Sequence, residues 1–132
     1  MDGSASFARF SSPCGVCVDG EGSIIVSDTY NHKIRKISTG GIVSTIAGTT
    51  AGWQDGSGSD NLFKFDCPAG ICLDHEGNII VADNYNHKIR MISRSGVVST
   101  IAGTTAGYCD GIVMKDIKFN APWGACIDDD GN

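Results

Sequence analysis

The sequence predicts an all-β fold built from four-stranded antiparallel meanders arranged in tandem. Residues 13–54 recur as residues 68–109, 55 positions later, with 29 of 42 residues identical, and a third copy opens at Pro122 and reaches Asn132. Short apolar runs alternate with turns rich in Gly, Asp and Asn, which is typical of strands joined by tight turns. No stretch shows a helical period over about ten residues.

Each copy is predicted to hold four strands. The first ends at an Asp-containing turn such as Asp19–Gly22, where Asp bonds its own backbone and Gly permits a positive φ. The second contains a continuous Ile-Ile-Val run, which is typical of a strand covered on both faces. The third follows an Asn-His pair, and a Gly-containing turn leads into the fourth. The predicted ranges in the two full copies are 14–18 and 69–73, 23–28 and 78–83, 33–38 and 88–93, and 42–47 and 97–102, and the first strand of the third copy is predicted over 123–127.

Tandem four-stranded meanders linked by a longer connection indicate β-propeller blades, with an open β-solenoid as the alternative. The long connections are rich in Gly, Ser, Thr and Asp, and each carries one aromatic residue, Trp53 or Tyr108. Connections of this length in a compact domain are often functional. The predicted division is blade 1 over 13–47, a connection over 48–67, blade 2 over 68–102, a connection over 103–121 and the first strand of blade 3 over 122–132.

The number of copies is small for a repeat fold. Each unit buries its apolar face against its neighbours, so about three units are needed for stability. We therefore expect a partial propeller of two blades plus one strand, which is either a fragment of a larger protein or a short product that self-associates through its open blade faces.

Composition narrows the function classes. The net charge of −5 argues against nucleic-acid binding, which calls for a basic surface. No apolar run approaches the length of a membrane span. Cys14 and Cys17 form a C-x-x-C pair, but residues three apart on a strand point to opposite faces, so the two thiols are poorly placed to share zinc. Six free thiols are expected, in the cytoplasm or another reducing intracellular compartment.

Two stretches carry a family resemblance. Gly22–Arg35 reads GSIIVSDTYNHKIR and Gly77–Arg90 reads GNIIVADNYNHKIR, each preceded by Pro-x-Gly-x-x-x-Asp, and both closely resemble the NHL repeat. The insert beginning at Asp55 looks like that of the longer NHL variant. The resemblance implies a propeller of about six blades. Among proteins that resemble this one, some bind RNA through a basic face, and some are lyases or hydrolases with a metal in the central channel.

The copied polar residues of the motif are predicted to be structural. The carboxylates at the end of the second strand accept hydrogen bonds from the following turn and pair with the arginines seven residues later, and the histidines bond the turn that begins the third strand. These residues are Asp28, His32, Arg35, Asp83, His87 and Arg90. The Asp-rich segment from Asp128 lacks the glycine spacing of a calcium-binding EF-hand loop.

One end of the blades is predicted to gather exposed aromatic and polar loop residues, a composition that suits a protein-binding face. The candidates are Tyr30, Asn31, Trp53, Asp55, Tyr85, Asn86, Tyr108 and Asp110. For Trp53 and Tyr108, packing onto the next blade is the alternative. The predicted innermost strands offer Cys, Val, Ile, Leu and Ala rather than His, so no catalytic, cofactor or metal residue is assigned. We predict a non-enzymatic protein–protein interaction scaffold. The first alternative is an RNA-binding propeller, and the second is a metal-dependent lyase or hydrolase.

Overall fold

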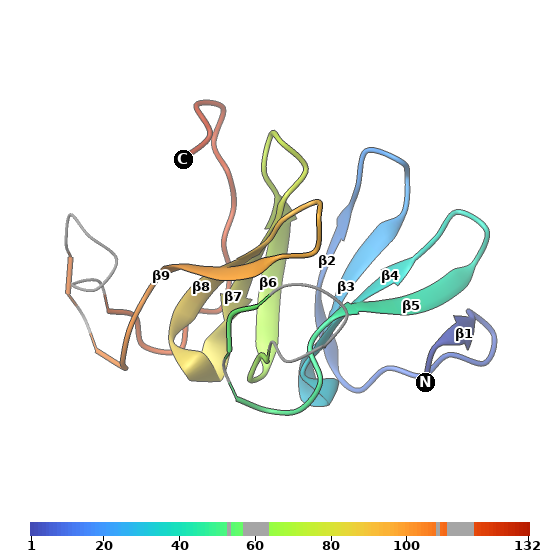
Figure 1. Cartoon of the computed structure of the whole chain (residues 1–132), viewed down its shortest axis with the longest axis horizontal. Helices are drawn as coiled ribbons and strands as arrows, with labels where there is room; N and C mark the ends of the chain where they lie inside the picture. The colour runs from blue at the N-terminus through green and yellow to red at the C-terminus, as the bar shows by residue number, and fades with distance from the viewer. Residues whose placement is uncertain (53, 57–63, 108, 111–117) are drawn as a thin grey trace.

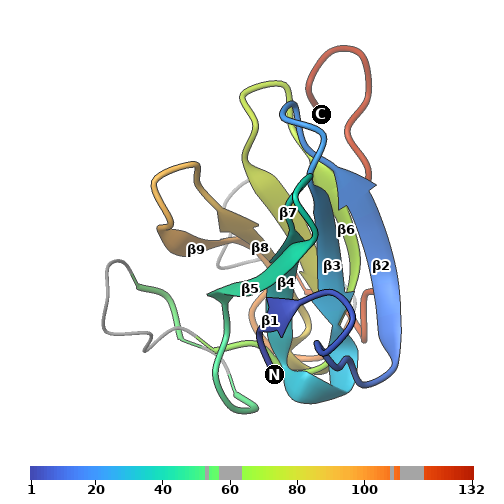
Figure 2. The same cartoon turned by 90° about the vertical axis from the view of Figure 1, so that its right-hand side faces the viewer.

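The computed structural model describes residues 1–52, 54–56, 64–107, 109–110 and 118–132. It contains two antiparallel sheets that stand face to face, as Figures 1 and 2 show. The first sheet has the order β1-β5-β4-β3-β2 and the second β6-β7-β8-β9. The strands are β1 (Gly3–Ser4), β2 (Pro13–Val18), β3 (Ile24–Asp28), β4 (Lys33–Ile37), β5 (Ile42–Ala47), β6 (Pro68–Leu73), β7 (Ile79–Asp83), β8 (Lys88–Ile92) and β9 (Val98–Ala102).

The predicted all-β class and four-stranded meanders are confirmed. β2–β5 form one propeller blade and β6–β9 the next, and β2 and β6 are the neighbouring inner strands. In both blades the register shifts next to the motif arginine, between Ile34 and Arg35 and between Ile89 and Arg90. A register shift of this kind is a β-bulge, which changes the direction in which a side chain points.

The core lies between the two sheets. Blade 1 contributes Ile25, Ile34 and Ala47, and blade 2 contributes a larger group from β6, β7, β8 and β9. Most of the Ile-Ile-Val run is buried in both copies. Its side chains alternate between the two faces of the sheet, and both faces are packed against other residues.

Two features differ from the sequence-based expectation. The segment 123–127 is not a strand: it runs beside β6, and the Gly70 N–H donates to the Trp123 carbonyl at 2.7 Å. The N-terminal segment, in contrast, belongs to the first sheet, because Gly3 and Ser4 pair with Val43 and Ile42.

In each blade one 3₁₀ helix connects the second and third strands. These helices are η1 (Thr29–Asn31) in blade 1 and η2 (Asn84–Asn86) in blade 2. Both end at a histidine in the left-handed region, His32 at φ 55° and His87 at φ 57°. Figure 1 places both turns at the same end of the molecule, opposite the tight hairpins.

Candidate functional site at the junction between blades

The motif arginine of blade 2 is buried and donates hydrogen bonds to several partners. Arg90 is fully buried, and its NH1 donates to Asp83 Oδ2 at 2.7 Å and to the Lys64 carbonyl at 2.9 Å. Its NH2 donates to the Gln54 carbonyl and to Asp55 Oδ1, both at 2.9 Å. The pairing predicted from the seven-residue spacing is therefore present, and the same guanidinium also binds the connection that precedes the blade.

Blade 1 repeats this arrangement with the N-terminal segment. Arg35 NH1 donates to Asp28 Oδ2 at 2.7 Å and to the Arg9 carbonyl at 2.8 Å, and NH2 reaches the Met1 carbonyl at 2.6 Å and Asp2 Oδ1 at 2.9 Å. A phenylalanine ring lies against each guanidinium. Phe10 is 4.7 Å from Arg35 and Phe65 is 5.1 Å from Arg90, measured from Cζ to the ring centroid. Met1–Phe10 therefore docks on blade 1 in the way that the described parts of 54–65 dock on blade 2.

The buried carboxylates accept bonds from three directions. Besides the arginine, Asp83 accepts from the Asp66 amide at 2.7 Å and from Asn86 Nδ2 at 2.8 Å. Asp28 accepts in the same way from the Ser11 amide and from Asn31. Each carboxylate therefore fixes both its own turn and the residues that enter the blade's inner strand.

Glycines permit the inner strands to touch. A Cβ on Gly15 would overlap the Ala69 carbonyl oxygen, and one on Gly70 would lie 2.6 Å from Gly124 Cα. Hydroxyl and amide donors add to the contact: Thr29 Oγ1 donates to the Pro68 carbonyl at 2.7 Å, and Asn84 Nδ2 donates to the Pro122 carbonyl at 2.9 Å. Thr29 and Asn84 each precede the copied Tyr-Asn-His, and this place in the repeat is the sequence signal for their role in the junction.

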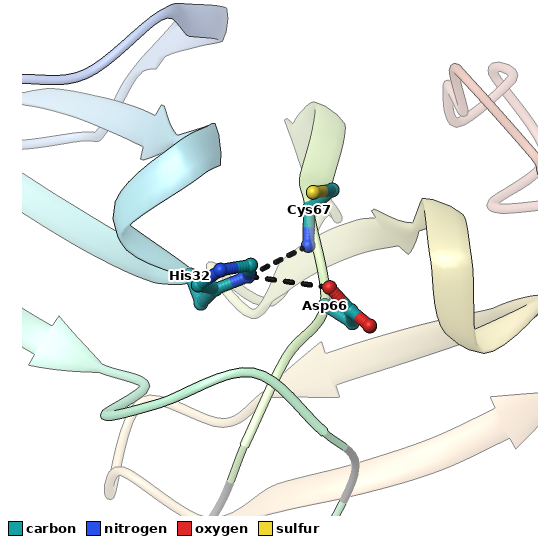
Figure 3. A group of neighbouring side chains, drawn as sticks. All are labelled: His32, Asp66 and Cys67. Atoms are coloured by element: carbon teal, nitrogen blue, oxygen red, sulfur yellow. Dashed lines mark hydrogen bonds and ion pairs between the residues drawn. The ribbon is translucent and has the colours of Figure 1, made fainter.

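The histidines bond their own turns through the backbone, His32 N–H to the Thr29 carbonyl and His87 N–H to the Asn84 carbonyl, while their side chains reach across the junction. Figure 3 shows the His32 ring facing Asp66 and Cys67, in the segment that enters β6. Nδ1 of His32 accepts from the Cys67 amide at 3.1 Å and lies 3.3 Å from Asp66 Oδ1. His87 Nδ1 accepts from the Ala121 amide at 2.9 Å. The left-handed backbone at the end of each 3₁₀ turn directs the ring outward to the next copy, which local sequence does not reveal.

The junction between blade 1 and blade 2, here the first junction, also brings together side chains of the types that bind metals. His32, Asp66 and Cys67 each offer one donor atom, and these atoms lie within 4.8 Å of one another. His32 and Asp66 are partly accessible, with 24% and 29% of their side chains exposed, and Cys67 is buried. Burial and the neighbouring Asp66 carboxylate raise the pKa of the Cys67 thiol.

The described residues of the predicted loop face differ in their exposure. Tyr30 and Tyr85 occupy equivalent positions and are 63% and 61% exposed. Asn31 and Asn86 are half-buried and donate hydrogen bonds within the fold, and Asp55 accepts from Arg90 although its side chain is 42% exposed. Asp110 is exposed, and Trp53 and Tyr108 lie outside the described residues.

Several cationic side chains of β4 and β8 are held within the fold. Arg35 and Arg90 are 1% and 0% exposed, and Lys88 Nζ donates to the Thr104 carbonyl at 2.6 Å. Lys36 pairs with Asp19 at 2.8 Å.

All six cysteines are free. Cys17 is half-buried, and burial followed by the neighbouring Cys72 raises the pKa of its thiol to about 11. Cys126, at the equivalent position of the third copy, is exposed.

Comparison with known proteins agrees with this architecture. The NHL repeat family model matches residues 10–37 and 65–90. The chain belongs to the NHL-repeat family. It is 30% identical over 139 residues to NHL repeat-containing protein 2 of Bos taurus, covering 94% of this chain and 19% of the bovine protein. It is 37% identical over 94 residues to Protein SUPPRESSOR OF QUENCHING 1, chloroplastic, of Arabidopsis thaliana, covering 69% of this chain and 9% of that protein. This NHL chain thus spans less than a fifth of either relative.

Solved structures share the fold. An auxiliary nutrient binding protein from Bacteroides ovatus aligns with a TM-score of 0.77 at 20% identity, over 92% of this chain and 33% of its own. Virginiamycin B lyase from Staphylococcus aureus aligns with a TM-score of 0.63 at 14% identity, over 99% of this chain and 36% of its own. These likenesses concern the blade architecture alone. Within the described part of this NHL chain, no helix is both long and apolar enough to cross a bilayer.

Proposed function

We propose that this NHL chain is a non-enzymatic protein-interaction module that presents Tyr30 and Tyr85 to a protein partner. The observation that carries the proposal is their exposure, 63% and 61%, at equivalent positions of adjacent blades. Figure 1 supports it, because both 3₁₀ turns lie at one end of the blades. Tyrosine is enriched at binding hot spots because a rigid ring with a polar tip contributes large contact area at low entropic cost.

Catalysis has less support. The motif histidines and aspartates are engaged in bonds that join the blades or hold their turns. The inner strands β2 and β6 read PCGVCV and PAGICL and carry no carboxylate or imidazole. RNA binding also has less support, because Arg35 and Arg90 are buried.

Site-specific photo-crosslinking tests the tyrosine face. A benzophenone amino acid is placed at position 30, at position 85, or at Phe7, which is 74% exposed and lies outside the 3₁₀ turns. We expect one polypeptide to be captured from positions 30 and 85 and not from position 7. With that polypeptide purified, Tyr30→Ala/Tyr85→Ala is expected to raise the Kd at least about tenfold, whereas Phe7→Ala leaves it unchanged. Equal capture from all three positions contradicts the proposal.

A second candidate is association between blade faces of separate copies. Val16 and Val18 on β2 are 65% and 60% exposed, whereas Ile71, the counterpart of Val16 in blade 2, is 8% exposed because blade 1 covers it. Ile101 on β9, 43% exposed, marks a matching open face of blade 2. Head-to-tail pairing of two copies would bury both faces. Sedimentation is expected to show concentration-dependent association that Val16→Ser/Val18→Ser abolishes; a monomer at every concentration contradicts it.

A further inference from the structure

The contact between His32 and Asp66 contains an electrostatic conflict. Nδ1 of His32 accepts a hydrogen bond from the Cys67 amide, so this nitrogen carries a lone pair rather than a proton. The same nitrogen lies 3.3 Å from Asp66 Oδ1, which is also an acceptor. Two acceptor atoms at this separation repel each other unless a cation lies between or beside them. The local geometry therefore favours a positive species at this point.

We propose that a zinc ion binds at this junction, held by His32 Nδ1, the Asp66 carboxylate and the Cys67 thiolate, with the fourth position open to water. Imidazole nitrogen, carboxylate oxygen and thiolate sulfur are the three donor types that zinc takes in proteins. Bond lengths of about 2.0–2.1 Å in a tetrahedral site put a nitrogen and an oxygen ligand roughly 3.3 Å apart. The observed separation of 3.3 Å between His32 and Asp66 matches that spacing.

The thiol needs a modest movement to complete the set. The donor atoms already lie within 4.8 Å of one another. Figure 3 shows the Cys67 sulfur turned away from the His32–Asp66 contact, so a rotation about the Cα–Cβ bond brings it toward the pair. The ion also replaces the Cys67 amide as the partner of Nδ1. Partial exposure of His32 and Asp66 gives the ion a route in.

The second junction provides an internal comparison. His87 Nδ1 makes the same bond to the backbone, at 2.9 Å from the Ala121 amide. The residues before Pro122 are Asn120 and Ala121, which lack the carboxylate and the thiol. Among the described residues, the histidine–backbone bond is thus common to both junctions, whereas the carboxylate and thiol donors lie at the first. Zinc there would link His32, which follows η1 in blade 1, to the segment that enters β6.

The test compares zinc binding by the reduced chain and two variants. Asp66→Asn/Cys67→Ala gives the first junction the residues that the second already carries, so it is expected to fold, which thermal unfolding checks. Cys109→Ser/Cys126→Ser removes two exposed thiols and serves as the control.

Equilibrium dialysis is expected to give one zinc per chain for the original sequence and for Cys109→Ser/Cys126→Ser. Asp66→Asn/Cys67→Ala is expected to bind at least about 100-fold more weakly, and zinc is expected to raise the Tm only of the two chains that bind it. Cobalt in place of zinc should show thiolate-to-metal absorption that this variant loses. Equal zinc binding by Asp66→Asn/Cys67→Ala, or its loss in the control, overturns the proposal.

Discussion

Replacing Gly15 with alanine should break the contact between the two inner strands. The added Cβ would overlap the Ala69 carbonyl oxygen and would lie 2.8 Å from Ser27 Oγ and 3.1 Å from the Ile71 amide nitrogen. Two of these three atoms belong to the backbone and cannot rotate away. Overpacking of this kind costs about 1–3 kcal/mol. The bonds that Ser27 Oγ makes to Gly15 and Ala69 would be distorted as well, at about 1 kcal/mol each. We expect a total loss of about 3–5 kcal/mol.

The matched control is Gly124→Ala, at the same position of the third copy. A Cβ there has nothing within 4 Å, so the substitution should change the free energy of unfolding by less than about 1 kcal/mol. Urea unfolding followed by far-UV circular dichroism measures both variants against the original chain. The reasoning is refuted if Gly15→Ala unfolds at the same urea midpoint as Gly124→Ala, because the only intended difference between them is the neighbouring strand.

Two further outcomes are expected. Phe65→Ala removes a ring that is 0% exposed and should cost about 3–5 kcal/mol, whereas Phe10→Ala, at a half-buried ring in the same role, should cost clearly less; equal shifts of the urea midpoint would contradict this. The Lys36 ammonium lowers the pKa of Asp19, so the pair contributes stability above the ordinary carboxyl pKa of 3.8 and loses it as pH falls through the folded pKa. Lys36→Met, which introduces the residue of the second copy at Met91, should raise the pKa of Asp19 in an NMR titration; an unchanged pKa would show that the turn's amides dominate.

The blades could be predicted from sequence because their cause is local. Apolar runs of the right length, turn residues at fixed offsets and the seven-residue spacing of Asp83 and Arg90 all lie within one copy. The docking of the N-terminal segment could not be predicted by the same ungapped comparison. Asp2 precedes Phe10 by eight residues and Asp55 precedes Phe65 by ten, so the two segments fall out of register although their ends make equivalent contacts with the arginine.

The candidate site was missed for a different physical reason. His32, Asp66 and Cys67 come from two copies, and only the packing of blade 2 on blade 1 brings them together. His32 is shared by both full copies, so its sequence context favours a structural role. Asp66 and Cys67 are where the copies differ, and their chemistry is apparent only beside the histidine of the preceding blade.

The residue before each copied proline joins a constant backbone to a variable side chain. Ser12, Cys67 and Ala121 all adopt positive φ, at 48°, 49° and 48°. A non-glycine residue in this region stores strain of about 1–3 kcal/mol, so surrounding contacts must fix it. The Asp83 carboxylate holds the preceding amide, and the His32 ring holds the amide of Cys67 itself. Because these contacts go to backbone atoms, the side chain at this position can change without loss of the restraint. At each junction the NHL frame thus holds this position through main-chain contacts, while its side chain differs between blades. In the one copy where that side chain is a thiol, bound zinc would replace the histidine–amide bond and hold Cys67 to His32 through the ion.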